Sequence, residues 1–419
     1  MGQNPHVRFV VGLVGGLALA LALAGAAHAD DRTPVTLEAV LAAASKAPAA
    51  QIGSKDIEAA EATYDAASAW PMSALHVGTN RLTAKVVAGA SIPLPIFGTI
   101  GAARHVAAAE ADVVRAEADL ALRDLRHRIV VAWIELLRAG GDVATSRVAA
   151  QQAADLQTIA KGRLDAGTGA DVDVTVATAA RARADVAVAS AIRAEDAASA
   201  ELAGLLGWDP ARSLRADGDA VIGPGGELPG LEARLAGHPE RLAGERRVAA
   251  AEANVDQVLV QRWPGLALEG EVNYDDRTIT EGTSVWDRTD AHVGIALDLP
   301  LFAHIGDKAR AARATAAAQR MRLAATEAEL SGRLVAAYAR WQAATERLAS
   351  IQRDVIPAQE KAATLSMQAY REGARDLSSA VLAERDLASA RAELNDARAA
   401  AAAAYADLAV AVGEDVHAR

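Results

Sequence analysis

Two hydrophobic periodicities alternate along this chain, and each of them occurs twice. Residues 72–94 and residues 265–300 alternate apolar and polar positions with a period of two, which predicts a β-hairpin in each segment. Residues 98–206 and 304–412 carry apolar positions at helical spacing with no strand signal, which predicts two long helical hairpins. The chain is therefore expected to be mainly α-helical, with a small part in β-strands.

The two halves of the chain are copies of one unit. A Trp-Pro pair precedes each strand segment, and a Pro-x-Phe sequence follows it. Equivalent residues in the two halves are 205 or 206 positions apart, as in Pro95 and Pro300, Phe97 and Phe302, Gly167 and Gly373, and Gly207 and Gly413. A period this long indicates duplication of a whole structural unit of helix, hairpin, long helix and helix.

The duplication sets the expected division of the chain. The first repeat is expected over 30–207 and the second over 232–413. Residues 208–231, rich in Gly, Pro and Asp, are expected to form the linker between them, and 414–419 a short tail.

The first residues resemble a secretory signal peptide, expected over 1–29. A basic residue, Arg8, precedes the apolar stretch 9–27, and Ala27-His28-Ala29 is a small-x-small cleavage site. The alternative is an uncleaved membrane anchor, because the apolar stretch is long enough to span a bilayer. In either case the sequence predicts that the chain is exported.

Each predicted hairpin has one apolar face and one face of charged or small residues. Strands of about ten residues match the span of a tilted strand in a bilayer, so we expect the apolar face to contact lipid. Four strands cannot close a barrel and open edges are not tolerated in lipid, so several chains are needed, and three would give twelve strands. The expected lipid-facing residues are Leu266, Leu268, Val272, Val293, Ile295 and Leu297.

The long helices carry the heptad pattern of antiparallel coiled coils. Gly140-Gly141 and Pro357 are expected to kink or interrupt them. The expected seam of the second copy includes Leu330, Leu334, Ala337, Leu348, Ile351, Ala358 and Leu365. One soluble coiled coil would explain the helices equally well, and only the hairpins argue against it.

Composition excludes several classes of function. The net charge of −11 argues against a nucleic-acid partner, and the absence of cysteine excludes disulfides and thiolate metal sites. The nine histidines show no metal-binding spacing, and no nucleophile motif occurs. We expect no enzyme activity, no cofactor and no metal site.

Two similar sequences lie where each long helix turns back. Residues 163–173 and 370–376 each place a glycine, Gly167 or Gly373, before a polar turn and a return helix. Together with the duplicated order of elements, these tips resemble the TolC-like outer-membrane efflux duct family over nearly the whole mature chain. The resemblance implies a homotrimer in the cell outer membrane, with a twelve-strand β-barrel continued by an α-helical barrel across the periplasm. It also implies two partners, a periplasmic adaptor protein and an inner-membrane pump.

The resemblance also implies roles for residues of the tips. Tyr370, Arg375 and Asp173 match gating residues of the family, and Asp376 is a further candidate. The family's constriction acids fall on Ser379 and Leu382, so an acidic ring is absent at those positions. For Asp173 and Asp376 the alternative role is plain capping of a helix start. The candidates for adaptor docking are Arg163, Leu164, Gly167 and Gly373.

The sequence therefore favours a passive exit duct of a tripartite efflux system that passes small molecules or metal ions out of the cell. The alternative is a soluble periplasmic coiled-coil scaffold or adaptor, whose hairpins would pack on one another. The paired Trp-Pro breaks before two-faced strands favour the duct, because a scaffold has no use for an alternating lipid face.

Overall fold

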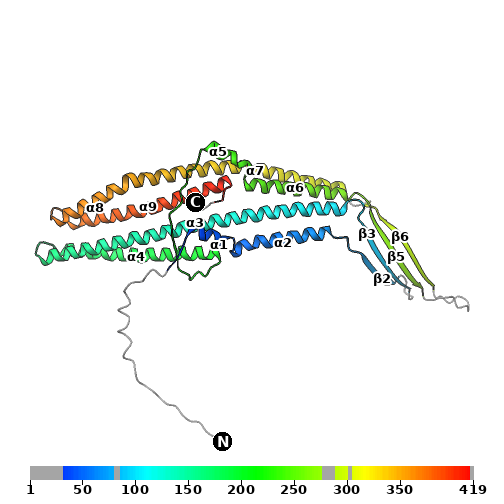
Figure 1. Ribbon diagram of the computed structural model, residues 1–419, viewed down its shortest axis with the longest axis horizontal. Helices are drawn as coiled ribbons and strands as arrows, with labels where there is room; N and C mark the ends of the chain where they lie inside the picture. The colour runs from blue at the N-terminus through cyan, green and yellow to red at the C-terminus, as the bar shows by residue number, and fades with distance from the viewer. Residues whose placement is uncertain (1–31, 80–84, 276–287, 301–303, 416–419) are drawn as a thin grey trace, which may run out of the picture.

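A computed structural model describes residues 32–79, 85–275, 288–300 and 304–415 of the chain. The expected signal peptide and the tip of each β-hairpin lie outside the described residues. Figure 1 shows a long rod of paired helices with a β-sheet bending away at one end and two helical tips at the other. The termini of the described chain lie near the middle of the rod.

The first repeat supplies one side of the rod. Its helices are α1 (Leu37–Ala44), α2 (Pro48–Ser68), α3 (Thr99–Asp165) and α4 (Asp171–Leu206). Thr36 caps α1, because its Oγ1 accepts the Ala39 amide at 3.3 Å. α3 runs the full length of the rod and packs on α2 toward the sheet and on α4 toward the tip (Figure 1).

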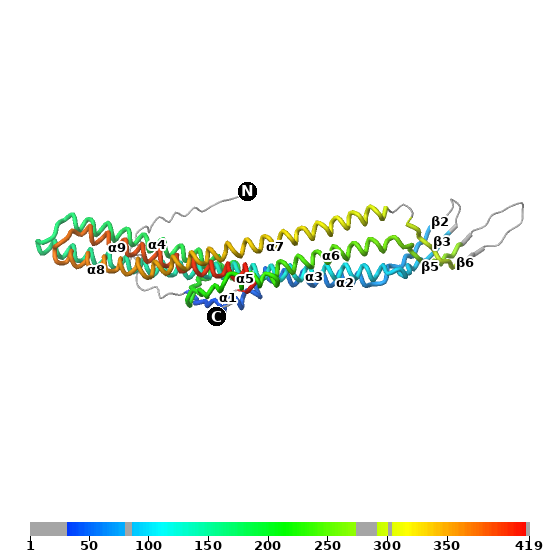
Figure 2. The backbone as a smooth tube through the Cα atoms, turned by 90° about the horizontal axis from the view of Figure 1, so that it is seen from above, coloured from blue at the N-terminus to red at the C-terminus, as the bar shows by residue number. Residues whose placement is uncertain are grey.

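The second repeat supplies the other side with the same order of elements. Its helices are α6 (Pro239–Val260), α7 (Ile305–Ser350), α8 (Ile356–Arg371) and α9 (Leu377–Val412). α6 packs on α7 toward the sheet, and α8 on α9 toward the tip. Figure 2 shows both repeats converging on the strands at the sheet end. The expected duplicated fold, mainly α with four strands in the main sheet of the described chain, is confirmed.

The four-stranded sheet is antiparallel, in the order β2-β3-β5-β6. The strands are β2 (Ala74–Thr79), β3 (Lys85–Leu94), β5 (Gly265–Asp275) and β6 (Arg288–Asp298). β3 of the first repeat pairs with β5 of the second, with Ile92 opposite Leu268. The two hairpins thus form one continuous surface, and β2 and β6 are its edges.

A second, smaller sheet lies at the middle of the rod and was not expected from the sequence. β1 (Thr33–Val35) pairs in parallel with β4 (Leu214–Ala216), which falls inside the segment expected to be a linker. α5 (Leu228–Glu232) and a 3₁₀ segment (Ala233–Gly237) then lead into α6. Trp133 of α3 lies under this sheet, 1% exposed, and its Nε1 donates to the Val35 carbonyl at 3.0 Å. The linker therefore helps to close the largest hydrophobic core of the described residues.

The expectation of a break at Gly140-Gly141 is wrong. α3 continues through both residues without interruption. A Cβ on Gly141 would lie 3.1 Å from the side chain of Asn395 on α9, and one on Gly140 would lie 3.5 Å from Glu195 on α4. The glycines therefore do not end the helix, and the lack of a side chain at Gly141 allows α9 to pack closely against α3.

The interruption expected at Pro357 is present, and it shifts the seam of the second coiled coil. A π-helical segment, Ile351–Val355, precedes the proline, and the Ile356 amide donates to the Ile351 carbonyl five residues earlier. Leu330, Leu334, Ala337, Leu348 and Ile351 are buried as expected, but Leu365 is 54% exposed. Beyond the π segment the buried residues are Ala363 and Tyr370, one position later than the heptad predicts. A π turn inserts one extra residue into the helix. The side chains of α8 are therefore rotated about the helix axis, and the buried positions shift by one residue.

Candidate functional site

The sheet presents a continuous apolar face that no described part of the chain covers. Directly opposite residues share a face, and the pairs Leu266–Leu297 and Leu268–Ile295 place four large apolar side chains together. Several are far more exposed than a soluble core allows: 72% for Ile295, 78% for Val293 and 80% for Leu75. The six residues expected to face lipid, Leu266, Leu268, Val272, Val293, Ile295 and Leu297, all lie on this face.

The opposite face of the sheet carries polar and charged groups. One row of paired residues crosses all four strands: His76, Gly89, Glu271 and His292. Nε2 of His76 lies 3.9 Å from one carboxylate oxygen of Glu271, and Nε2 of His292 lies 3.6 Å from the other. A Cβ on Gly89 would come within 2.4 Å of the His76 ring, so the absence of a side chain there lets the ring reach across β3 toward β5.

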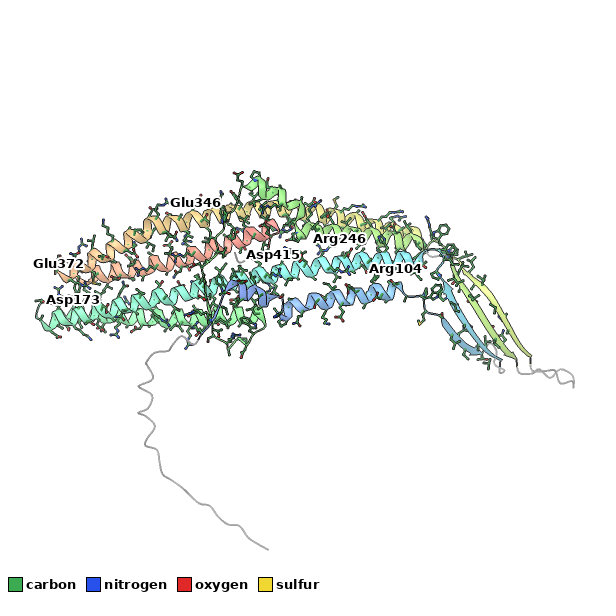
Figure 3. The ribbon with its side chains drawn as sticks, viewed as in Figure 1. Arg104, Asp173, Arg246, Glu346, Glu372 and Asp415 are labelled. Atoms are coloured by element: carbon green, nitrogen blue, oxygen red, sulfur yellow. The ribbon has the colours of Figure 1, made fainter. Side chains whose placement is uncertain are left out.

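The other end of the rod is formed by the two helical tips. Gly167 after α3 and Gly373 after α8 both adopt left-handed backbone, with φ of +72° and +76°. L-residues with a side chain are strained in this conformation, which explains glycine at both turns. Figure 3 shows Asp173 at the first tip and Glu372 at the second, at the same end of the rod.

Tyr370 joins the two tips. Its ring is 1% exposed and packs against Leu156, Ala160 and Ala177 of the first repeat, and Leu377 of its own. Its buried hydroxyl has no hydrogen-bond partner among the described residues. Burial and the nearby Asp173 charge raise the pKa of Tyr370, and the neighbouring Arg163 guanidinium opposes this shift.

Arg163 is half-buried and connects the first tip to the second. Its guanidinium carbon lies 4.9 Å from the centre of the Tyr370 ring, and its Nη1 donates to the Tyr370 carbonyl. Its Nη2 also donates to the Thr168 carbonyl at 3.4 Å. This docking candidate is therefore engaged within its own chain, whereas Gly167 and Gly373 are exposed at the ends of the tips.

The other gate candidates lie at the starts of the return helices. Asp173 is in the first turn of α4, where its charge complements the helix dipole. Asp376 is the residue that precedes α9; its carboxylate accepts the Ser379 hydroxyl at 2.6 Å, and this bond is the main cause that lowers its pKa. Arg375 is exposed beside it. The structure brings Asp173 near Tyr370 but shows no hydrogen bond between their described side chains.

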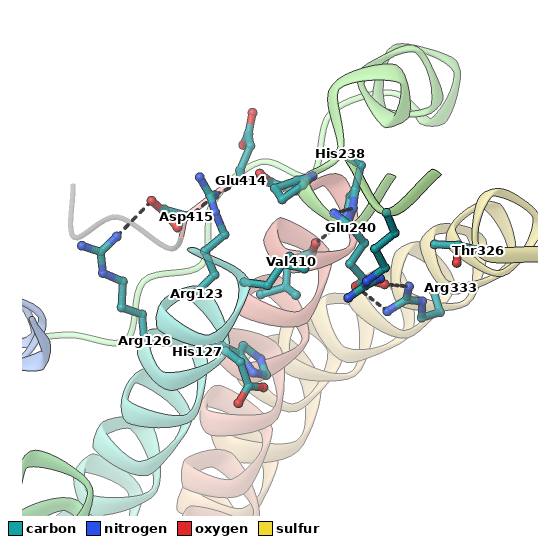
Figure 4. A pocket seen from close by; sticks show the side chains of 15 residues that line it. Arg123, Arg126, His127, His238, Glu240, Thr326, Arg333, Val410, Glu414 and Asp415 are labelled. Atoms are coloured by element: carbon teal, nitrogen blue, oxygen red, sulfur yellow. Dashed lines mark hydrogen bonds and ion pairs between the residues drawn. The ribbon is translucent and has the colours of Figure 1, made fainter. Parts of the chain in front are cut away.

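A cavity of about 410 Å³ lies where the two repeats meet at mid-rod (Figure 4). Arg123 and Arg126 of α3 both bind Asp415, at 3.1 and 3.2 Å, so the expected tail is tied to the first repeat. His238 before α6 accepts the Glu240 amide at Nδ1 (3.1 Å), and its Nε2 lies 3.2 Å from the Val410 carbonyl. The two ion pairs therefore join the tail to the first repeat, whereas the contacts of His238 tie α6 to α9 within the second repeat.

The described residues hold no group of three or more His, Asp or Glu side chains placed to bind a metal ion. In the same part of the chain, no helix is both long and apolar enough to cross a membrane.

The described chain is thus a helical rod that carries a four-stranded sheet with one bare apolar face and two edge strands, β2 and β6. The model of the family described as outer membrane efflux protein matches residues 231–414, which is the second repeat. No curated protein sequence matches the chain significantly. The match to this family model confirms the resemblance to TolC-like outer-membrane efflux ducts. The expected location in the outer membrane, extending into the periplasm, agrees with this family.

Solved structures of outer-membrane proteins share the fold across nearly the whole chain. VceC of Vibrio cholerae is 17% identical with a TM-score of 0.72, and the match covers 91% of this chain and 97% of VceC. CmeC of Campylobacter jejuni is 13% identical with a TM-score of 0.73, covering 91% and 87%. MtrE of Neisseria gonorrhoeae is 17% identical with a TM-score of 0.71, covering 91% and 89%. At these identities the match establishes the fold.

Proposed function

We propose that this protein is the exit duct of a tripartite efflux system. Three copies would close a twelve-strand barrel in the outer membrane, and their helices would continue it as a tunnel across the periplasm. The duct would pass small molecules or metal ions outward. The observation that carries this proposal is the sheet: its apolar face is exposed and its polar face carries the His76–Glu271–His292 row, as a barrel with lipid outside and water inside requires.

The tips are the proposed inner entrance of the duct. Tyr370 with Arg163 would hold the two helical hairpins of one chain together, and Asp173, Arg375 and Asp376 would line the opening beside them. The exposed turns at Gly167 and Gly373, with the adjacent Leu164, would receive the periplasmic adaptor protein, which in turn contacts an inner-membrane pump. The described tips offer backbone turns and charged side chains for docking and no catalytic constellation, so no enzyme activity is proposed.

The native mass of the mature chain after cell fractionation tests the proposal. A duct is expected to sediment with the outer membrane, to require detergent for extraction, and to have the mass of three chains. A monomer or dimer in the soluble periplasmic fraction would refute the duct and support a coiled-coil scaffold instead.

A further inference from the structure

The edges of the sheet show how one copy of the chain meets the next. Among the described residues β2 pairs with β3 alone and β6 with β5 alone, so each has one free edge. We infer that β6 of one copy pairs with β2 of the next copy in a single register, with Leu297 opposite Leu75. This inference rests on the proposed duct and specifies its subunit interface.

The duplication supplies a rule of equivalence for the strands. The outgoing strands β2 and β5 follow Trp-Pro pairs that are 193 residues apart, at Trp70 and Trp263. The return strands β3 and β6 lead to prolines that are 205 residues apart, Pro95 and Pro300. Each residue of the first hairpin therefore has a defined equivalent in the second.

The observed hairpins verify this rule. In the first hairpin Leu75 is opposite Ala90, and the rule converts this pair to Leu268 opposite Ile295, which is the pairing observed in the second hairpin. The remaining pairs of the two hairpins agree in the same way. The two offsets come from the sequence alone, so this agreement is independent of the strand pairing.

The same rule converts the pairing between repeats into the pairing between copies. Within the chain the return strand of the first repeat meets the outgoing strand of the second, with Ile92 opposite Leu268. The equivalent of Ile92 is Leu297 and the equivalent of Leu268 is Leu75. The return strand of the second repeat therefore meets the outgoing strand of the next copy's first repeat through this pair.

The deduced register satisfies two conditions that were not used to obtain it. Leu297 and Leu75, 53% and 80% exposed, both lie on the apolar face, so that face continues across the interface; a slip of one residue would place a leucine on the polar face. On the polar face, Ala296 then comes opposite His76 of the next copy.

The strand tilt is the second condition. The row of paired residues that starts at His76 on β2 crosses Gly89 on β3 and reaches Glu271 on β5. The residue of β5 equivalent to His76 is Glu269, two positions earlier. Each hairpin therefore shifts the strands by two residues along the sheet. Two residues of about 3.3 Å over two strand spacings of about 4.8 Å give a tilt of about 35°. Closed barrels have tilts of roughly 35–45°, so this stagger is compatible with closure.

Disulfide trapping in outer membranes tests the register, and the chain has no cysteine of its own. The variant Leu75→Cys/Leu297→Cys should form interchain disulfides and give a ladder of linked chains under non-reducing conditions. Directly opposite Cα atoms lie about 4.5–5.5 Å apart, within the disulfide range, whereas diagonal neighbours lie about 7–8 Å apart, so we expect roughly tenfold more cross-linking than in Leu75→Cys/Ile295→Cys. Ile92→Cys/Leu268→Cys, an observed pair within one chain, is the positive control.

The outcomes separate the register from the function. A ladder from the shifted pair and none from Leu75→Cys/Leu297→Cys would overturn the register and leave the barrel in place. A disulfide-linked dimer of the single variant Leu297→Cys would show that β6 of one chain pairs with β6 of another chain. That result would also overturn the register. No interchain cross-link from any pair, with the chain soluble, would refute the register together with the duct.

Discussion

Arg163→Ala should loosen the connection between the two helical tips. The side chain is half-buried, lies 4.9 Å from the Tyr370 ring centre and donates to the Tyr370 carbonyl. A hydrogen bond from a charged donor stabilises by about 1.5–3 kcal/mol, and a partly exposed cation–π contact adds about 0.5–1 kcal/mol. Because solvent screens a half-exposed guanidinium, we expect about 2 kcal/mol, near the lower end of the combined range.

Hydrogen exchange of the tip amides measures this loss directly. The amides of Gly373 and Ala374 donate to the Tyr370 and Ala369 carbonyls, at 3.0 and 2.8 Å, and they exchange when the second tip opens. A loss of about 2 kcal/mol corresponds to roughly 30-fold faster exchange. Arg163→Lys keeps the charge but not the planar fork, and should give a smaller acceleration.

Arg371→Ala is the matched control, because it removes an exposed arginine from the same tip. Its exchange should remain within about twofold of the unchanged protein, since surface substitutions usually alter stability by less than about 0.5 kcal/mol. Equal exchange rates in Arg163→Ala and Arg371→Ala would refute the assignment of Arg163 as a tie between the tips.

Three further predictions concern the tip, the sheet and the junction. Tyr370→Phe should leave hydrogen exchange at the tip unchanged or slow it, with a gain of up to about 1 kcal/mol in the free energy of opening, because the buried hydroxyl has no partner in the described chain. Markedly faster exchange would reveal a hydrogen bond that this hydroxyl makes in the assembly. Leu268→Arg should reduce the outer-membrane trimer, because arginine facing lipid costs about 2–4 kcal/mol at mid-bilayer, whereas Glu269→Gln on the polar face should be tolerated; equal yields would contradict the two faces. Burial lowers the pKa of His238, so its ring binds a proton less readily in the folded chain than in the unfolded chain. The free energy of unfolding should therefore decrease as the pH falls from about 6.5 toward the lowered pKa of the folded chain. His238→Asn keeps a capping acceptor, and its melting temperature should therefore fall less between pH 7.5 and 5.5 than that of the unchanged protein.

The sequence predicted the parts of the fold that rest on local patterns. Period-two alternation located both hairpins, and glycine located both tips. The pairing of β1 with β4 had no comparable signal, because each strand has three residues and nearly the whole first repeat separates them. Arg163 shows the same limit at the site: its position beside a tip glycine suggested docking, but its contacts depend on a tyrosine 207 residues away.

The burial of Tyr370 depends on a feature that the heptad pattern does not contain. If α7 had continued as a regular helix, the seam through Ile351 would have passed through Ala358 and Leu365, and Tyr370 would lie one position off it. Pro357 has no amide hydrogen for a helical bond, and the π segment just before it adds the one residue that rotates α8. Leu365 then faces solvent and Tyr370 enters the core between the tips, where Arg163 can reach both its ring and its carbonyl. A proline some 20 Å along the helix from Tyr370, at 1.5 Å per residue, therefore sets the contact that joins the two tips.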